Sequence, residues 1–92
     1  MSNPRDPFIT TKILIKHFEV EDLTHSFEYI KDEYEECYFH TIKFDDYSIF
    51  ISEYLDDSEL LGGIYKGNDR LPINFEELEY TIILTKIKKY IK

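Results

Sequence analysis

The sequence contains no alanine, glutamine or tryptophan, and it has a single valine and a single cysteine, Cys37. One cysteine cannot form a disulfide within the chain, which excludes a disulfide-stabilised scaffold. No apolar run approaches the ~18 residues of a membrane span, and no basic start followed by an apolar stretch marks a secretory signal. We therefore expect a cytosolic protein, in the cytosol of the host cell if a phage or mobile element encodes it.

Basic residues are also scarce, since 11 Lys and Arg face 19 Asp and Glu and the formal net charge is −8. Nucleic-acid binding depends on neutralising phosphates with Lys and Arg, so we expect no direct binding to DNA or RNA. Aromatic side chains are abundant, at 16% of a chain that is 42% hydrophobic. Disordered acidic chains lack such residues, so a folded protein is expected.

The order of the sequence patterns predicts one small α+β domain over residues 9–92, preceded by a flexible arm over residues 1–8. The expected order is β-α-β-β-β-α, a mostly antiparallel sheet with two helices packed on it. The predicted elements are a strand over 9–18, a helix over 23–36, strands over 38–44, 47–55 and 60–66, and a helix that begins at Asn74.

The first two predicted elements depend on different periodicities. The run from Ile9 to Phe18 is rich in β-branched residues, which favours a strand. In the next segment Asp22 is a candidate helix cap, and apolar residues recur at spacings of four, three and four, the pattern of one helical face. That face consists of Leu23, Phe27, Ile30 and Tyr34.

Turn signals define the three middle strands. Asp45 and Asp46 separate two apolar runs and predict a tight hairpin, although the usual glycine is missing. Gly62 and Gly63 predict a bulge or bend in the fourth strand, and residues 67–69 form a turn signal.

The last element is predicted as a helix from its cap and its charges. Asn74 and Glu77 have the spacing of a capping box, and acids precede lysines along the segment, as the helix dipole favours. A strand through 81–85 is the competing interpretation. The expected apolar face of the helix is Tyr80, Ile83, Leu84, Ile87 and Ile91.

Candidate chemistry begins with the Cys37-x-x-His40 spacing, which His17 and His25 could complete to four metal ligands. Residues three apart on a strand point to opposite faces, and no orienting third group accompanies a Cys–His nucleophile pair. We therefore expect a half-buried thiol and a surface histidine, with no metal, cofactor or catalytic residue, and a protein that is not an enzyme.

Two further motifs have structural explanations. Residues 62–67, GGIYKG, lack the spacing of a phosphate-binding loop, and a glycine-bent strand is expected instead. The acidic pairs at 45–46 and 56–57 lack a calcium-loop pattern, which favours solvated turns.

The charge pattern is strongly uneven. Fourteen of the 19 acids lie between Glu19 and Glu59, where Lys31 and Lys43 are the only bases. On the predicted first helix, Glu28 and Asp32 are like charges four residues apart, and three glutamates lie near the C-terminus, where the dipole disfavours them. Such an uncompensated arrangement is where a functional site is expected. An ordinary acidic surface kept for solubility is the alternative.

A functional acidic surface requires a basic partner, and nucleic-acid-binding grooves are the commonest strongly basic protein surfaces. In size, charge and composition the chain resembles the acidic counter-defence proteins of phages, such as DNA mimics and anti-CRISPR proteins. We therefore expect an inhibitor that binds a basic, nucleic-acid-binding protein or enzyme and has no membrane partner. The expected interface residues are Glu28, Tyr29, Asp32, Glu33, Glu35, Glu36, Asp45, Asp46, Asp56 and Asp57.

Two other functions stay open at this point. An antitoxin or immunity protein that neutralises a basic toxin would also be small and acidic. An enzyme or metal protein would use Cys37 and His40, and metal analysis would distinguish it from both binding proteins.

Overall fold

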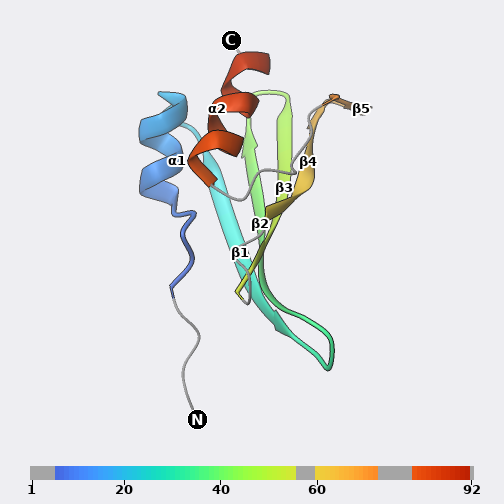
Figure 1. Cartoon of the computed structure of the whole chain (residues 1–92). Coiled ribbons are helices and arrows are strands. Elements are labelled where there is room, and N and C mark those ends of the chain that lie inside the picture. Colours follow the sequence, from blue (N-terminus) through green and yellow to red (C-terminus); the bar gives the residue numbers. More distant parts are fainter. Residues whose placement is uncertain (1–5, 56–59, 73–79, 92) are drawn as a thin grey trace.

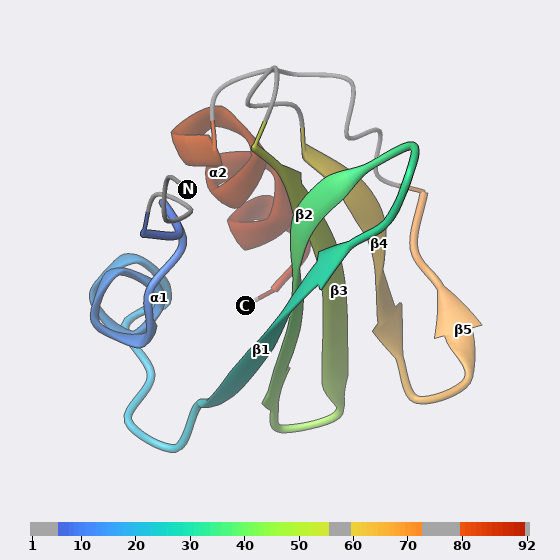
Figure 2. The same cartoon turned by 90° about the horizontal axis from the view of Figure 1, so that it is seen from below.

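The computed structural model describes residues 6–55, 60–72 and 80–91. These residues form a five-stranded antiparallel sheet in the order β1-β2-β3-β4-β5, and both helices lie on the same side of it, as Figure 1 and Figure 2 show. The α+β class with two helices on an antiparallel sheet is therefore confirmed. The elements are α1 (Thr11–Phe18), β1 (Thr24–Lys31), β2 (Glu36–Phe44), β3 (Tyr47–Tyr54), β4 (Leu60–Lys66), β5 (Asp69–Arg70) and α2 (Tyr80–Tyr90).

The segment predicted as the first strand is helix α1, so that prediction is wrong. The Thr10 side chain caps the helix by accepting the Ile13 N–H at 3.3 Å, and Glu19 ends it in the left-handed conformation with φ 58°. Leu14 and Phe18, four residues apart, are both buried. One buried helical face and two caps therefore outweigh the strand preference of the β-branched residues.

The segment predicted as the first helix is strand β1 followed by the turn into β2. All eight residues of β1 pair with β2, from Thr24 opposite Lys43 to Lys31 opposite Glu36. Phe27 is 49% exposed and Tyr34 is 92% exposed, so the expected apolar helical face does not form. The hairpin also removes the charge repulsion that a helix would carry, because it sets Lys31 opposite Glu36.

The predicted hairpin at Asp45 and Asp46 is confirmed as the turn between β2 and β3. Asp45 has φ 50°, a left-handed conformation that aspartate tolerates better than most residues. The fourth strand is also confirmed, but its pairing with β3 continues through Gly62 and Gly63 without an inserted residue, so there is no bulge. A Cβ atom on Gly62 would lie 1.8 Å from the Phe50 carbonyl oxygen, which explains the glycine.

The last helix is confirmed from Tyr80 onward, while the predicted cap at Asn74 and Glu77 lies outside the described residues. Its buried residues Ile83, Leu84 and Ile87 belong to the face that the sequence predicted, and Ile91 packs partly against the core. The strand alternative over 81–85 is therefore wrong. No helix in the described part of the chain has the length and apolar character needed to cross a membrane.

The hydrophobic core lies between the two helices and the sheet. The sheet contributes alternate residues from β2, β3 and β4, and Phe18 of α1 contacts Phe44 at 5.6 Å between ring centroids. Lys88 of α2 and Glu19 at the end of α1 form an exposed ion pair at 3.6 Å. Both described helices thus cover one face of the sheet, and no element of the described residues covers the other face (Figure 2).

Candidate functional site

The predicted interface residues at 28–36 lie on the β1–β2 hairpin, whose tip is residues 32–35. Asp32 organises this tip. Its Oδ1 accepts the N–H groups of Tyr34 and Glu35 at 2.8 Å each, and its own N–H donates to the Glu35 carbonyl at 2.9 Å. An aspartate that binds the backbone two and three residues later fixes a turn locally. The tip is therefore held by its own sequence and needs no packing against the core.

The tip projects away from the helices (Figure 1), and it presents an aromatic ring among carboxylates. Tyr34 is 92% exposed at its centre, and Asp32 and Glu33 are exposed beside it. Glu28, Glu35 and Glu36 add three more carboxylates along the hairpin, against the single base Lys31. We call residues 28–36 the acidic hairpin.

Tyr29 carries a second exposed ring of the acidic hairpin. Its hydroxyl donates a hydrogen bond to the Glu36 carboxylate, and its ring lies 5.6 Å from that of Tyr38. The hydrogen bond to Glu36, followed by burial and nearby negative charge, raises the pKa of Tyr29 to about 12. Tyr29 is therefore protonated at neutral pH. Its side chain is 41% exposed.

The structure brings together six of the ten predicted interface residues and separates two others. Asp45 and Asp46 lie at the β2–β3 turn, which is at the opposite end of the strands from the acidic hairpin. Asp56 and Asp57 lie outside the described residues. The six on one hairpin are Glu28, Tyr29, Asp32, Glu33, Glu35 and Glu36.

A second polar arrangement, which the sequence did not suggest, crosses the helix-covered side of the sheet. Thr11 Oγ1 lies 2.9 Å from His25 Nδ1, and His25 Nε2 lies 2.8 Å from His40 Nδ1. His40 Nε2 lies 3.1 Å from Glu53 Oε1. The four side chains come from α1, β1, β2 and β3, so the network joins one helix to three neighbouring strands.

Glu53 is the buried end of this network. Its side chain and that of His40 are fully buried, and its carboxylate also accepts the N–H groups of Phe8 at 2.8 Å and Ile9 at 3.3 Å. A buried carboxylate is tolerated only when such donors replace water. Glu53 therefore ties the segment before α1 to the sheet.

Proton positions along the network follow from the carboxylate, which only accepts hydrogen bonds. With neutral imidazoles, His40 Nε2–H donates to Glu53 and His40 Nδ1 accepts from His25 Nε2–H. His25 Nδ1 then accepts the Thr11 hydroxyl proton. Burial, and then the nearby His40, lower the pKa of His25 to about 4, so His25 is neutral at pH 7.

The order hydroxyl, imidazole, imidazole and carboxylate can hold and pass a proton. Its hydroxyl end, Thr11, is exposed at the first residue of α1. Two hollows bordered by described residues lie elsewhere, one beside Phe50 and Tyr65 and one beside His17 and Lys88. The geometry gives the network a structural role in fastening α1 to the sheet.

Cys37 and His40 are both more buried than the half-buried thiol and the surface histidine that the sequence suggested. His40 is completely buried in the network, so the prediction of a surface histidine is wrong. Cys37 is buried as well, and burial, followed by the charges of Glu35 and Asp32, raises the pKa of its thiol. Among the described residues, no group of three or more His, Cys, Asp or Glu side chains is arranged to hold a metal ion.

Comparison with protein-family models, with curated proteins and with solved structures finds no match to this chain.

Proposed function

We propose that this protein uses the acidic hairpin to bind a basic surface on a nucleic-acid-binding protein or enzyme and to block that surface. The observation that carries the proposal is the projecting tip, where Tyr34 is 92% exposed among carboxylates. We also propose that this encounter takes place in the cytosol, which is the host cytosol if a phage or mobile element encodes the protein.

The charge of the acidic hairpin selects the partner. Residues 28–36 carry five carboxylates and one lysine, and the whole chain has a formal net charge of −8. Such a surface attracts a basic groove over about 10 Å at 0.1 M salt and repels other acidic proteins. The carboxylates stand in for phosphates, because both accept hydrogen bonds from Arg and Lys.

The exposed aromatic rings supply the contact area that charge alone does not give. Tyrosine is enriched among the residues that dominate interface energy, since it buries much surface at low entropic cost. Tyr34 is free to enter a pocket, and Tyr29 lies further back along the same hairpin. The turn at Asp32 fixes the backbone of Tyr34 before binding, which lowers the backbone entropy lost on association.

The test compares two double variants with equal charge. Glu28→Lys/Glu33→Lys changes the acidic hairpin, and Glu21→Lys/Asp22→Lys changes exposed acids between α1 and β1. Each reversal adds two charges, so both variants have a formal net charge of −4. Immobilised wild type and variants are incubated with purified basic nucleic-acid-binding proteins and with lysate of the expressing cell. DNA or RNA is then added as a competitor.

We expect to find a partner protein that binds both wild type and the Glu21/Asp22 variant. Nucleic acid should displace this partner. The Glu28/Glu33 variant should bind this partner at least about tenfold more weakly. Equal loss of binding in both variants would show that only net charge matters. A hairpin-dependent partner that nucleic acid does not displace would contradict nucleic-acid mimicry and favour the antitoxin alternative.

A further inference from the structure

The face of the sheet that the helices leave uncovered carries its own side-chain pattern. The strand register sets Lys43, Ser48, Tyr65 and Arg70 side by side across β2, β3, β4 and β5. Phe50 follows two residues after Ser48 on this face, and its ring lies 5.9 Å from that of Tyr65 in an edge-to-face arrangement. Two basic residues therefore border a pair of aromatic rings.

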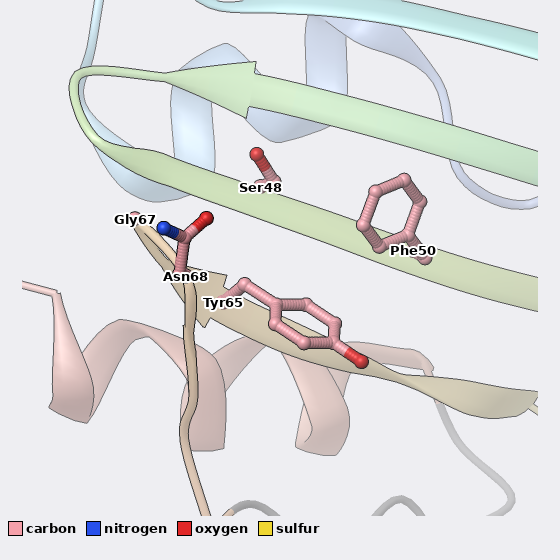
Figure 3. A pocket seen from close by; sticks show the side chains of 5 residues that line it. All are labelled: Ser48, Phe50, Tyr65, Gly67 and Asn68. Carbon is pink, nitrogen blue, oxygen red and sulfur yellow. The ribbon is translucent and has the colours of Figure 1, made fainter.

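A hollow of about 430 Å³ lies at this place. Figure 3 shows the rings of Phe50 and Tyr65 beside the Ser48 hydroxyl and the Asn68 amide, with the helices behind the sheet. Small-molecule sites usually measure about 300–1,000 Å³ and combine apolar walls with a few polar groups. The hollow therefore has the size and lining suited to a small molecule with one planar ring.

Gly63 lies near this hollow on the same face of the sheet. It lies opposite Phe50 in the register, and it has no side chain to fill the space beside that ring. The Arg70 side chain reaches over it, since a Cβ atom on Gly63 would lie 3.3 Å from Arg70 Nε. The guanidinium group thus lies beside Gly63, which pairs with Phe50, and Arg70 itself pairs with Tyr65.

The two cations near the hollow have no neutralising partner in the part of the chain that the structure describes. Lys43 and Arg70 are exposed, and neither makes a hydrogen bond or ion pair with another described residue. Three strand spacings separate them, about 14 Å between Cα atoms. In a chain with 19 acids, two unpaired cations beside an aromatic hollow favour an anionic ligand.

We propose that this hollow is a binding site for a planar aromatic ring that carries an anionic group and has the size of a mononucleotide. The ring stacks against Phe50 and Tyr65, and the anion receives hydrogen bonds from Arg70. Ser48 and Asn68 bind the polar edge of the ligand. The site lies at the opposite end of the strands from the acidic hairpin and does not depend on the function proposed for it.

Nearby carboxylates set the strength of this site. Asp45 and Asp46 form the adjacent β2–β3 turn, and the Asp46 carbonyl accepts the Gly67 N–H at 2.8 Å. Asp69 is next to Arg70 in sequence, and neighbouring residues of a strand point to opposite faces. The two turn carboxylates oppose anion binding through solvent, so the affinity should increase when these residues are made neutral.

The experiment is a titration of the full chain with AMP, followed by the amide signals of residues lining the hollow. Adenosine tests the ring without the anion, and ribose 5-phosphate tests the anion without the ring. Indole-3-acetate tests a carboxylate in place of the phosphate. The signals of Ser48, Tyr65 and Asn68 should shift saturably with AMP, at a Kd at least about tenfold below that of adenosine and ribose 5-phosphate.

Arg70→Gln should weaken AMP binding about tenfold or more. The matched control is Lys66→Gln, which removes one positive charge at the same end of the sheet. Lys66 lies over the Tyr47 ring at 5.6 Å, on the helix-covered face, so its loss should have little effect. Equally tight binding of indole-3-acetate would support the site and identify a carboxylate ligand. The proposal fails if AMP binds no more tightly than its two parts, or if Lys66→Gln weakens binding as much as Arg70→Gln.

Discussion

Removal of the buried carboxylate of Glu53 should destabilise the fold more than any change at the acidic hairpin. Glu53 is fully buried and accepts hydrogen bonds from His40 Nε2 and from the N–H groups of Phe8 and Ile9. Glu53→Ala removes the acceptor for all three donors and leaves them in the core.

The expected loss follows from the number of donors. A buried donor left without a partner costs about 1–3 kcal/mol, and a hydrogen bond to a charged group contributes about 1.5–3 kcal/mol. We therefore expect Glu53→Ala to lower the free energy of unfolding by about 3–5 kcal/mol, a large share of the ~5–15 kcal/mol typical of a domain. Glu53→Gln retains an accepting oxygen, so its loss should be roughly half as large.

Urea unfolding measures this difference directly. The control is Ser52→Ala, because Ser52 is the neighbouring residue of β3 on the uncovered face, opposite Phe39 and Leu61. This control should stay within about 1 kcal/mol of wild type. In thermal unfolding, Glu53→Ala should lower Tm by at least roughly 12 °C. A loss below about 1 kcal/mol for Glu53→Ala would show that the network does not hold the N-terminal segment to the sheet.

Four further predictions concern other parts of the molecule. The free energy of unfolding should fall by roughly 1–2 kcal/mol as pH drops from 6.5 towards 4, because the folded state keeps the pKa of His25 near 4. His25→Gln should make this pH dependence weaker in urea unfolding. Gly62→Ala should cost at least about 3 kcal/mol in the same assay, because its Cβ would meet the Phe50 carbonyl, whereas Gly63→Ala should cost less than half as much. Cys37 should react with a thiol reagent much more slowly at pH 8 in the folded than in the unfolded protein, and equal rates would contradict its burial. A gel shift at about 150 mM salt should show no micromolar binding of DNA or RNA, given the net charge of −8.

The sequence predicted the elements with strong turn signals and failed where one segment fitted two periodicities. The β2–β3 hairpin, β4 and the buried face of α2 were predicted, because an acidic turn, a glycine turn and a helical spacing marked them. The segments before residue 37 were assigned to the wrong elements. Residues 9–18 are rich in β-branched residues, yet Leu14 and Phe18 also have helical spacing, and the choice depends on packing that a sequence does not show.

The charges of the second segment contained the signal that would have corrected it. As a helix, residues 23–36 would set Glu28 near Asp32 and gather glutamates at the C-terminus. We interpreted that cost as a mark of function, but the chain avoids it by forming a strand and a turn. Asp32, in particular, is a turn residue that binds the Tyr34 and Glu35 amides. Unfavourable electrostatics in a predicted helix or strand is therefore first of all evidence that the element was assigned wrongly.

The candidate site was also only partly predictable from the sequence. The structure places five of the predicted acids, together with Tyr29, on one hairpin, and their role in partner binding stays a prediction. The histidine–glutamate network was missed, since His25, His40 and Glu53 come from three strands and share no sequence motif. A sequence signal did exist: His40 and Glu53 occupy alternating positions with Ile42 and Ile51 in two apolar strands, which places them on the buried face.

The network and the acidic hairpin are connected through β1 and β2. His25 and His40 fasten these strands to α1 and to Glu53, and Phe27, which pairs with His40, is already 49% exposed. The tip of the hairpin extends away from both helices (Figure 1). A hairpin fastened at its base and held by Asp32 at its tip has few conformations to lose on binding, which favours affinity. Loss of Glu53 should therefore weaken partner binding even though Glu53 is fully buried, and Glu53→Gln should weaken it less than Glu53→Ala. If both Glu53 variants remain folded and bind as tightly as wild type, the base of the hairpin contributes nothing to recognition and the tip acts alone.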